Sequence, residues 1–547
     1  MTAHTLDFFG SGSQSVQYAR SYGSVDQFAH QLTTGFSRYV GEPVDASFKL
    51  RPGRVLTYNH DKLSKAGKWF AHKSLQAWSA ATGIKFKKVP FAKADIKYVQ
   101  GDQDGAYTVT NYNSKGDITK AKVNIPKWWH KGEAYKLASY SYQTFLHETG
   151  HALGLGHAGN YNGNARFPKD AKFANDSWQM SVMSYFSQTE NTKVSGSKAF
   201  ILTPMPADLE AIHDLYGRPS GSKKVNTGST TYGFGSKAKG PVKHLTKQKS
   251  VGAFTIFDQG GTDAINMSKT SKSQRIDLNP GSFSNVLGKS KNLQIEKGTW
   301  IENAIGGQGA DVLIGNKLVN KLIGYSGADI LVGNGGNDRL YGNDGKDKLI
   351  GGLGNDLLRG GKGADVLNGG SGFDSVSYRY EATGVDVNLT TGQSGRGASG
   401  DTFLSIEGVE GSVHADNLIG NAAANWVSGR SGDDVLQGMG GADRLYGGAG
   451  NDVLAGGAGD DLLHGGSGAD EFIFESGNDV IADFSDIGGD SISIDADLVV
   501  VTDAADLIAN SAQSDGTDTT ITFDNGDTLI VRGVADPSSL VDDIAFF

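Results

Sequence analysis

The chain contains no cysteine among its 547 residues. A disulfide framework is therefore excluded, and stability outside a cell has to come from packing and from bound metal. The first thirty residues show no basic segment followed by an apolar run, and no stretch of about 18 apolar residues occurs anywhere. The sequence thus shows no Sec-type signal and predicts no membrane span.

Each half of the chain has few charged residues of one sign: acidic residues are scarce in the first half and basic residues in the second. Residues 1–250 hold 33 Lys and Arg against 17 Asp and Glu, whereas the remainder holds 18 against 43. The basic half has its lysines scattered among turns and strands, without a helix-turn-helix or RNA-binding motif. We therefore expect a solvated basic surface and no nucleic-acid partner.

One short motif carries the chemistry: His147-Glu-Thr-Gly-His151-Ala-Leu-Gly154-Leu-Gly-His157. Residues four apart lie on one helix face, so His147 and His151 can present two imidazoles to one zinc ion, with Glu148 beside them as catalytic base. In a continued helix, His157 would lie about 15 Å along the axis, far beyond a Zn–N bond of about 2 Å. Gly154 is therefore predicted to end the helix and return His157 to the metal.

The alternative for this motif is an accidental match, because a bare HExxH arises in helices without a site. The additional glycine and third histidine match the longer metzincin signature, which a downstream methionine turn completes. Such a turn is present in Ser181-Val-Met183-Ser-Tyr185-Phe186. Taken alone, Met183 would be an ordinary core methionine and Tyr185 a surface ring.

The zinc helix, the Met-Ser-Tyr turn and the run Phe173-Ala-Asn-Asp-Ser-Trp-Gln-Met-Ser together resemble the serralysin branch of the metzincins, which are secreted bacterial endopeptidases. The resemblance extends over nearly the whole chain. It implies zinc on His147, His151 and His157, and Glu148 as general base. It also implies Met183 as an apolar floor and Tyr185 as a further ligand that swings off the metal to hydrogen-bond the oxyanion. His60, His72, His130 and His213 have no comparable spacing and are interpreted as packing or surface residues.

From Gly306 the chain repeats every nine residues in the form G-G-x-G-x-D-x-U-x, where U is large and apolar. Twelve of fifteen units keep glycine at the fourth position and aspartate at the sixth. Such repeats build a parallel β-roll in which two units make one coil. A disordered glycine-rich linker is the alternative, but linkers do not hold Asp and Leu in register. The units start at Gly306, Gly315, Gly324, Gly333, Gly342, Gly351, Gly360, Gly369, Gly411, Gly420, Gly429, Gly438, Gly447, Gly456 and Gly465.

Carboxylates eighteen residues apart stack on consecutive coils, and with loop carbonyls they suit Ca²⁺. Without calcium this half is expected to be largely unfolded, because its negative charges repel and its core is thin. Asn320, His414 and Asn425 break the pattern, so sites that use them should be weak or absent. The expected calcium residues of the repeats are Gly307, Gly309, Asp311, Asp329, Asp338, Asp347, Asp356, Asp365, Asp374, Asp434, Asp443, Asp452, Asp461 and Asp470.

These repeats resemble the RTX motif of proteins exported by the type I route. The tail Asp543-Ile-Ala-Phe-Phe547 is similar to the acidic-then-apolar export signal that serralysins carry. The region 226–302 resembles the family's junction, where calcium bridges the catalytic and repeat domains; Asn226 stands where the family commonly has arginine. The junction positions are Asn226, Gly228, Thr230, Asp258, Gly260, Asp263, Trp300 and Glu302.

The predicted fold is an α+β metzincin domain, a twisted sheet plus helices, followed by an all-β parallel roll. Expected elements of the catalytic half are a helix at 62–82 and strands at 84–89, 95–99, 107–112 and 120–125, of which 107–112 is the edge strand above the cleft. The predicted order is a propeptide at 1–22, a catalytic domain at 23–233, a junction at 234–305, a first repeat block at 306–377, an insert at 378–410, a second block at 411–473, and a cap with secretion signal at 474–547.

The function predicted from these patterns is a secreted, extracellular zinc endopeptidase with one catalytic zinc and several structural calcium ions. Expected partners are protein substrates, the type I secretion apparatus and a proteinaceous inhibitor, and the chain is expected to be a monomer. Two other classes remain in view: a calcium-dependent adhesin with a vestigial zinc site, and an RTX lipase. No GxSxG nucleophile elbow is present, which argues against the lipase.

Overall fold

The computed structural model describes residues 3–6, 21–50, 55–101, 105–130, 132–133, 135–220, 224–246, 252–398, 400–501 and 503–547. Two compact units divide the chain: unit 1 comprises Met1–Asn303 and unit 2 comprises Ala304–Phe547. The predicted junction, residues 234–305, therefore falls almost entirely within unit 1. Most of the predicted propeptide, residues 1–2 and 7–20, lies outside the described residues.

Unit 1 is built on a six-stranded sheet with the strand order β1-β5-β6-β4-β2-β3 among its described residues. The central pairs are parallel, and β5 runs antiparallel to β6. The strands are β1 (Ala3–Leu6), β2 (Leu56–Asn59), β3 (Phe86–Lys88), β4 (Ile96–Val99), β5 (Tyr107–Tyr112) and β6 (Ile118–Asn124). Strand β5 is in turn paired antiparallel with β1, which forms this edge of the sheet.

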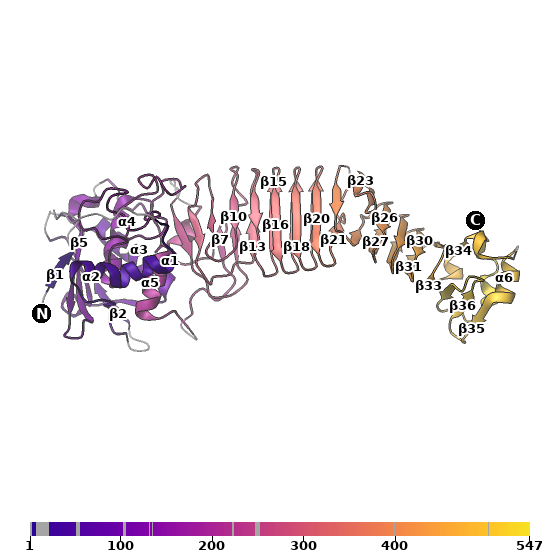
Figure 1. Cartoon of the computed structure of the whole chain (residues 1–547), viewed down its shortest axis with the longest axis horizontal. Coiled ribbons are helices and arrows are strands. Elements are labelled where there is room, and N and C mark those ends of the chain that lie inside the picture. The colour runs from indigo at the N-terminus through magenta and orange to yellow at the C-terminus, as the bar shows by residue number, and fades with distance from the viewer. Residues whose placement is uncertain are drawn as a thin grey trace. The chain divides into compact units, whose positions relative to one another are not determined.

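The helices of unit 1 are α1 (Val25–His30), the π-helical segment η1 (Gln31–Gly35), α2 (Phe36–Val40), α3 (Lys65–Thr82), α4 (Tyr140–Ala152) and α5 (Pro206–Tyr216), with short 3₁₀ segments η2 (Phe91–Lys93), η3 (Lys127–His130) and η5 (Gly240–His244). Helix α3 packs on α4 (Figure 1), and the Ser74 hydroxyl donates to the Phe145 carbonyl at 3.0 Å. The segment α1–η1–α2 is helical, although the sequence analysis named no element there.

Helix α3 begins at Lys65, three residues after the predicted start at residue 62. The Ser64 hydroxyl accepts a hydrogen bond from the Gly67 amide at 3.1 Å and so caps the helix. At the other end Gly83 adopts a left-handed conformation with φ of 71°. The predicted strands agree with β3, β4, β5 and β6 to within a few residues. Trp78, Phe70 and Leu75 of α3 are buried, as their spacing indicates.

Short strands complete unit 1: β7 (Thr231–Gly233), β8 (Phe254–Ile256), β9 (Ala264–Asn266), β10 (Arg275–Asp277), β11 (Phe283–Ser284) and β12 (Leu293–Ile295). Strand β13 (Asn303–Ile305) spans the point at which the units divide. Within unit 1, β7 pairs in parallel with β9, and β8 with β12. These parallel pairs hold the segments of the predicted junction next to one another.

Unit 2 is a parallel β-roll whose strands lie side by side as a ladder (Figure 1). Strands two apart in the sequence pair in parallel with an offset of eighteen residues, as Leu322 with Leu340 on β15 and β17. The apolar residue of each repeat, for example Leu331, is buried between the two sheets. The roll strands before the insert are β14 (Val312–Ile314), β15 (Lys321–Ser326), β16 (Ile330–Gly335), β17 (Arg339–Asp344), β18 (Lys348–Leu353), β19 (Leu357–Lys362), β20 (Val366–Ser371) and β21 (Ser375–Ser377).

The insert, residues 378–410, continues the roll instead of leaving it. Its strands are β22 (Val385–Asn388), β23 (Gln393–Arg396), β24 (Thr402–Leu404) and β25 (Gly408–Glu410). One sheet passes through the insert in the order β20-β24-β23-β22-β26, with β23 antiparallel to both neighbours. The other sheet passes directly from β21 through β25 to β27 in parallel. The insert is thus an elongated coil.

The second repeat block and the C-terminal part follow. Their strands are β26 (Asn417–Asn421), β27 (Trp426–Ser431), β28 (Val435–Gly440), β29 (Arg444–Ala449), β30 (Val453–Ala458), β31 (Leu462–Ser467), β32 (Glu471–Phe474), β33 (Asn478–Ile481), β34 (Ser491–Ile494), β35 (Ala512–Ser514), β36 (Thr519–Thr522), β37 (Thr528–Val531) and β38 (Ile544–Phe546), with α6 at Ala504–Ser511. The tail strand β38 pairs in parallel with β34, so the roll sheet extends into the last residues.

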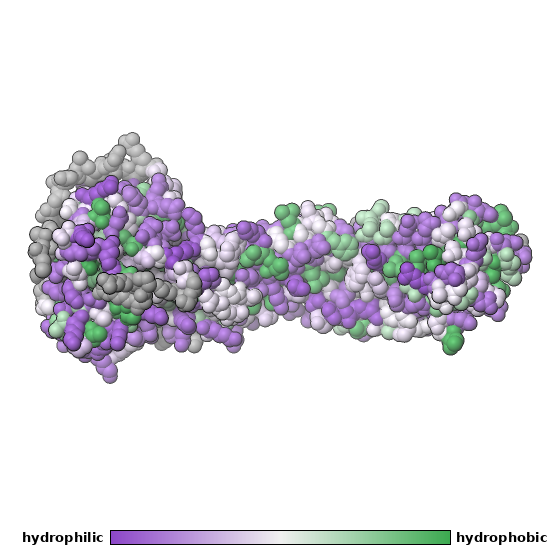
Figure 2. Space-filling view, turned by 90° about the horizontal axis from the view of Figure 1, so that it is seen from below, coloured by the Kyte–Doolittle hydropathy of each residue, from purple (hydrophilic) through white to green (hydrophobic). Residues whose placement is uncertain are grey.

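The predicted fold class, an α+β domain followed by an all-β parallel roll, is confirmed. Within the described residues, no helix has the length and apolar character needed to cross a membrane. On the face shown in Figure 2, apolar residues of unit 2 occur in small separate spots among polar ones. Exposed large apolar side chains of unit 2 include Tyr325, Leu353 and Leu404.

Candidate functional site

The end of helix α4 returns the chain as predicted. The Leu155 amide donates to the Gly150 carbonyl at 3.1 Å, and the Gly154 amide donates to the His151 carbonyl at 2.9 Å. This pair of bonds is a Schellman motif, which needs a left-handed residue, and Gly154 has a φ of 104°. A Cβ atom at Gly154 would also lie 2.1 Å from the Ala46 carbonyl oxygen. Glycine is therefore required here by both conformation and space.

Beyond this turn the three predicted histidines meet. The Nε2 atom of His151 lies 3.1 Å from Nε2 of His147 and 3.1 Å from Nε2 of His157. Donors held tetrahedrally about 2.1 Å from an ion lie about 3.4 Å apart, so the spacing fits one zinc-sized cation. All three rings are buried, and together they form a group able to hold a metal.

Hydrogen bonds orient two of these rings. Nδ1 of His147 lies 2.8 Å from the Val182 carbonyl, and Nδ1 of His151 lies 2.7 Å from the Leu155 carbonyl. An Nδ1–H that donates to a carbonyl leaves Nε2 as the free lone pair. Burial lowers the pKa of His147 to about 4, and burial with neighbouring histidines holds the pKa of His151 and His157 well below the ordinary value. The rings are thus neutral, as metal ligands must be.

Glu148 lies beside the histidines and is 1% exposed. The Thr108 hydroxyl, on β5, lies 2.8 Å from Glu148 Oε2 and 2.9 Å from the Glu148 carbonyl oxygen. Among the described residues, Oε1 of Glu148 has no hydrogen-bond partner. Burial raises the pKa of Glu148 to about 8, and a bound dication would lower it again. One oxygen is fixed and the other is left for a further ligand.

Met183 and Tyr185 lie where the sequence places them. Met183 is fully buried beneath α4, and a Cβ atom at Gly150 would lie 2.7 Å from its Sδ atom. The ring centroid of Tyr185 lies 4.6 Å from that of His157 and 6.1 Å from that of His147. Burial raises the pKa of the Tyr185 phenol, which therefore keeps its proton. The structure thus brings all six predicted residues together around one point.

Two buried carboxyl groups hold the methionine turn, and the sequence analysis missed both. Asp208 on α5 accepts from the Ser181 hydroxyl at 2.6 Å and from the Val182 amide at 2.8 Å. Asp176 accepts from the Ser184 hydroxyl at 2.7 Å. Asp208 lies 26 residues from Val182, and no local motif marks it as a partner. Asp176 lies within the run that resembles the serralysins, but no local pattern marks it as the acceptor for Ser184.

The edge strand β5 carries Thr108 past the site. A further strand, β1, runs antiparallel along β5, pairing Leu6 with Thr108 and Ala3 with Asn111. Strand addition of this kind satisfies the free amides and carbonyls of an edge. The position that the sequence analysis reserved for an extended peptide is thus taken by residues 3–6 of the chain.

In the roll, the repeat aspartates form a ladder. The amide of most of them donates to Oδ1 of the aspartate eighteen residues later, as Asp311 to Asp329 at 2.7 Å and Asp338 to Asp356 at 2.7 Å. The second oxygen, Oδ2, is buried without a hydrogen-bond partner among the described residues at Asp329, Asp338, Asp347, Asp356, Asp365, Asp374, Asp434, Asp443, Asp452, Asp461 and Asp470. Burial raises the pKa of Asp329 and Asp434 to about 7. Buried carboxylate oxygens without a hydrogen-bond donor are suited to binding a cation.

The glycines of the first repeat fit the same pattern. The Gly307 amide donates to Oδ2 of Asp311 at 2.5 Å, and the Gly309 carbonyl lies against Gly327 of the next coil. Close stacking of loops is general in the roll. Gly459 has a φ of 143°, and a Cβ atom there would lie 1.7 Å from the Gly441 carbonyl oxygen.

The asparagines at predicted weak positions behave differently. Nδ2 of Asn425 donates to the Glu407 carbonyl at 3.2 Å, and Nδ2 of Asn320 donates to Oδ1 of Asn316 at 3.3 Å. Where aspartate leaves an oxygen unpartnered, asparagine supplies an NH₂ group that finds a protein acceptor. This difference supports the prediction of weak or absent cation sites at these units.

Several ladder residues were missed by the sequence analysis. Asp401 and Glu407 of the insert accept from the amides of Asp365 and Asp374, each at 2.9 Å. Asp479 accepts from the Asp461 amide at 3.0 Å. The spacing Gly477-Asn-Asp479, nine residues after Gly468-Ala-Asp470, could have revealed this last unit. Asp401 lies four repeat periods after Asp365, but its unit lacks glycine at the first and fourth positions, and Glu407 lies off the period.

The predicted junction residues also gather, all within unit 1. The Thr230 amide donates to Oδ1 of Asp263 at 2.7 Å, and the Asp263 amide donates to Oε2 of Glu302 at 2.7 Å. Oδ1 of Asp258 accepts from the Gly260 amide at 3.2 Å. Burial raises the pKa of Asp258 to about 6 and that of Asp263 to about 7.

The remaining junction residues lie on the same loops. Nδ2 of Asn226 donates to the Phe257 carbonyl at 2.8 Å, and the Gly228 carbonyl accepts from the Thr230 hydroxyl at 2.9 Å. Trp300 is partly buried, two residues before Glu302. Oδ2 of Asp263 is buried with no hydrogen-bond partner among the described residues, as in the roll.

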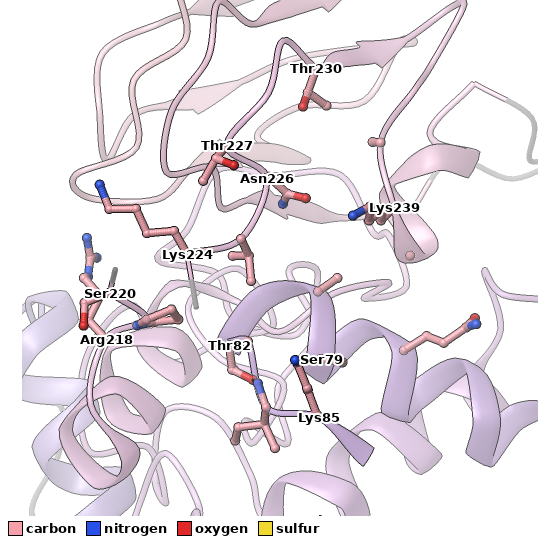
Figure 3. A pocket seen from close by; sticks show the side chains of 18 of the residues that line it. Ser79, Thr82, Lys85, Arg218, Ser220, Lys224, Asn226, Thr227, Thr230 and Lys239 are labelled. Carbon is pink, nitrogen blue, oxygen red and sulfur yellow. The ribbon is translucent and has the colours of Figure 1, made fainter. Parts of the chain in front are cut away.

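A cavity of about 1030 Å³ lies elsewhere in unit 1, and none of the three histidines lines it. Figure 3 shows Lys85, Arg218, Lys224 and Lys239 around it, with Asn226 and Thr230 on the loops above. It is lined by basic and small polar groups and holds none of the predicted catalytic residues. We therefore assign the chemistry to the histidine cluster and not to this cavity.

Comparison with known proteins agrees with these sites. The family described as Peptidase M10 serralysin C terminal matches residues 222–393. The RTX calcium-binding nonapeptide repeat matches residues 411–445, 419–454 and 446–481. Among solved structures, the extracellular lipase LipA from Serratia marcescens covers 53% of this chain and 45% of its own, at 17% identity with a TM-score of 0.21, which is too low to indicate a shared fold.

Curated relatives are similar over longer spans. Metalloprotease AprA of Pseudomonas entomophila is 34% identical over 343 residues, covering 55% of this chain and 70% of the relative. Serralysin C of Dickeya chrysanthemi is 38% identical, covering 44% of this chain and 51% of the relative. Serralysin of Proteus mirabilis is 34% identical, covering 53% and 64%. The match thus spans between about half and 70% of these relatives. With the three histidines, the methionine turn and the repeats in place, the chain belongs to the serralysin family of metalloproteases.

Proposed function

We propose that the chain is a zinc-dependent endopeptidase that hydrolyses peptide bonds in proteins. The observation that supports this most is the convergence of three neutral Nε2 atoms, 3.1 Å apart in two pairs, next to the unpartnered Oε1 of Glu148. His147, His151 and His157 would hold the zinc, with Tyr185 as a further ligand. When bound, zinc supplies a Lewis acid that polarises the scissile carbonyl and makes water more acidic.

The protein residues then have separate roles. Glu148 accepts the proton of the attacking water through Oε1 and delivers it to the leaving amine. The Thr108 hydroxyl fixes the other oxygen, so that the carboxylate cannot rotate away. Tyr185 donates its phenolic hydrogen to the carbonyl oxygen as negative charge develops there.

The substitution Glu148→Ala tests the base. It removes the carboxylate and leaves the histidines intact, so the purified variant should keep one equivalent of zinc at this site while casein cleavage falls by about 10³-fold or more. Zinc content by mass spectrometry and a casein assay with and without a chelator measure the two effects. Cleavage at the native rate by the variant would show that Glu148 is not the general base.

Substrate binding is proposed to use the edge of β5, where the peptide lies antiparallel. We propose that residues 1–22 act as a propeptide and that β1 occupies this place before it is removed. The supporting observation is the register of β1, which pairs Leu6 with Thr108, the residue that holds Glu148. A substrate and β1 would then compete for one edge.

Competition can be measured in a Glu148→Ala chain, which cannot trim itself. Deleting residues 1–22 should tighten binding of a fluorescent peptide by about 10-fold, because the edge no longer has to be vacated. The double change His4→Pro and Thr5→Pro should act in the same direction, since one of two consecutive amides faces β5. Equal peptide affinity in all three chains would show that β1 does not block the cleft.

The roll is proposed to bind calcium after secretion. The eleven unpartnered Oδ2 atoms of the repeat aspartates support this, as do Asp258, Asp263 and Glu302 in the junction cluster. Low calcium inside the cell would leave the roll loose for the type I apparatus, and millimolar calcium outside would fold it. The tail Asp543–Phe547 is the proposed signal, and the mature enzyme is proposed to be extracellular and monomeric, with a proteinaceous inhibitor as a further partner.

A further inference from the structure

A second group of metal-binding side chains lies in unit 1, apart from the catalytic histidines. Glu210 and His213 stand three residues apart on α5 and share one helix face. Glu296 comes from the turn after β12. One donor atom from each of the three lies within 4.8 Å of the others. From the sequence, His213 was interpreted as a packing or surface residue because it has no ligand spacing like that of the catalytic histidines, and Glu296 lies 83 residues away.

The His213 ring has the features of a metal ligand. It is 8% exposed, and neither Nδ1 nor Nε2 has a hydrogen-bond partner among the described residues. A buried imidazole with both nitrogens unpartnered is costly, because water has been removed and nothing replaces it. Burial and the nearby Arg218 lower the pKa of His213 to about 4, so the ring is neutral and cannot form an ion pair with the glutamates.

Glu296 is held firmly in the group. Its amide donates to the Ile256 carbonyl at 2.9 Å, and the Thr299 hydroxyl lies 3.3 Å from its Oε2 atom. The residue is 2% exposed, and burial raises the pKa of its carboxyl group to about 7, with Glu210 acting in the same direction. Two carboxyl groups and a neutral imidazole are therefore placed face to face in a poorly solvated site.

Arg218 is the cation that partly compensates this charge. It pairs with Oε1 of Glu296, donates to the Lys297 carbonyl at 2.9 Å and lies over the Phe257 ring. Its side chain is 39% exposed, and Figure 3 shows it at the edge of the cavity described above. Arg218 can therefore move toward solvent, and neither nitrogen of His213 accepts a hydrogen bond from it.

We propose that Glu210, His213 and Glu296 form a second transition-metal site, distinct from the catalytic one, that takes Zn²⁺ or a similar first-row dication. One nitrogen and two oxygen donors suit zinc, whereas the imidazole makes the site unsuited to calcium. Donors about 2.1 Å from a tetrahedral ion lie about 3.4 Å apart, so separations of up to 4.8 Å must shorten by up to about 1.4 Å. Glu210 is only partly buried and can supply that movement. A fourth position remains for water.

The location suggests what the ion would do. Helix α5 also carries Asp208, which holds the methionine turn, and the Thr299 hydroxyl lies 3.1 Å from the carbonyl oxygen of Asp258 in the junction cluster. A metal on Glu210, His213 and Glu296 would tie α5 to that loop. It would act as a structural clamp and leave peptide cleavage at the native rate at low temperature.

Zinc stoichiometry tests the proposal in the full chain with millimolar calcium, stripped of zinc and titrated with zinc alone against a chromophoric chelator. The native chain should bind two equivalents, and His213→Gln and Glu296→Gln should each bind one and still cleave casein. The variant His151→Gln should also bind one, and the double variant with His213→Gln none. The second equivalent should raise the melting temperature of the native chain but not that of His213→Gln.

The matched control is His30→Gln, an exposed histidine in the same unit, which should keep both equivalents. One equivalent in the native chain, unchanged in His213→Gln, would overturn the proposal. Loss of an equivalent in the control would do the same, since it would assign the ion to the surface. If His213→Gln fails to fold, an anomalous difference map at the zinc edge in native crystals decides between one peak and two.

Discussion

The two units reach a defined structure in different ways. Unit 1 has a core of large side chains, among them Trp78, Tyr98, Phe145 and Tyr142, and its catalytic residues come from separate elements. Unit 2 buries mainly one leucine or similar residue per strand and lines its loops with carboxylates that lack a counter-charge. We expect apolar packing to hold unit 1 alone, whereas unit 2 is proposed to need bound ions to complete its fold. The comparison predicts that the unit with the thinner apolar core depends more on bound metal.

Calcium removal should produce the largest difference in stability between the two units. In calcium-free buffer that contains zinc, the amides of residues 306–473 should lose nearly all protection from hydrogen exchange, because the aspartates repel one another. Amides of α3 and α4 should stay protected by their apolar core. Exchange followed by mass spectrometry resolves the two regions in one sample.

Restoring calcium to the same sample is the control, and it should return the protection of the roll. Full protection of residues 306–473 without calcium would show that the thin core suffices. Simultaneous loss from α4 and the roll would show that the contrast between the units is wrong.

A smaller effect is expected from Thr108→Val, which leaves the ions of both units in place. Without the hydroxyl, Oε2 of Glu148 loses its fixed donor, so casein cleavage should fall by about 10-fold while zinc content stays constant. Thr108→Ser keeps the hydroxyl and should restore most of the rate. If the Val and Ser variants are equally slow, the rate depends on the packing of the Thr108 side chain and not on its hydrogen bond to Glu148.

The smallest effect is expected from the substitution of a single aspartate of the ladder. Asp356→Asn supplies an NH₂ group in place of the unpartnered Oδ2, so the calcium midpoint for folding of the roll should rise by about two- to five-fold. Far-UV circular dichroism during a calcium titration measures it. The same change at Asp344, an exposed aspartate outside the ladder, should leave the midpoint unchanged. An equal shift in both variants would mean that only net charge counts.

Whether a contact could be predicted from the sequence depends on how far apart its two residues lie along the chain. The zinc histidines lie within eleven residues and the roll repeats every nine, so local spacing specified them. Thr108 is 40 residues from Glu148, and Asp208 is 26 from Val182. Their meeting depends on how β5 and α5 pack, which no short pattern encodes. The pairing of His213 with Glu296 was missed for the same reason.

The insert shows the same limit within the roll. Its strands leave the nine-residue period, so the sequence indicated only a gap between two blocks. The ladder crosses the gap because Asp401 and Glu407 take the positions of repeat aspartates. Glu407 lies off the nine-residue period, and Asp401 keeps the period without the repeat glycines at the first and fourth positions, so both are recognised only once the strand pairing is known.

This crossing has a consequence for cooperativity. In a linear array, each coil is stabilised only by its two neighbours, and a break divides the array into parts that melt separately. Because Asp365 and Asp374 bond to Asp401 and Glu407, the two repeat blocks form one array and not two. Order that begins at one end can therefore propagate through the insert to the other end, coil by coil.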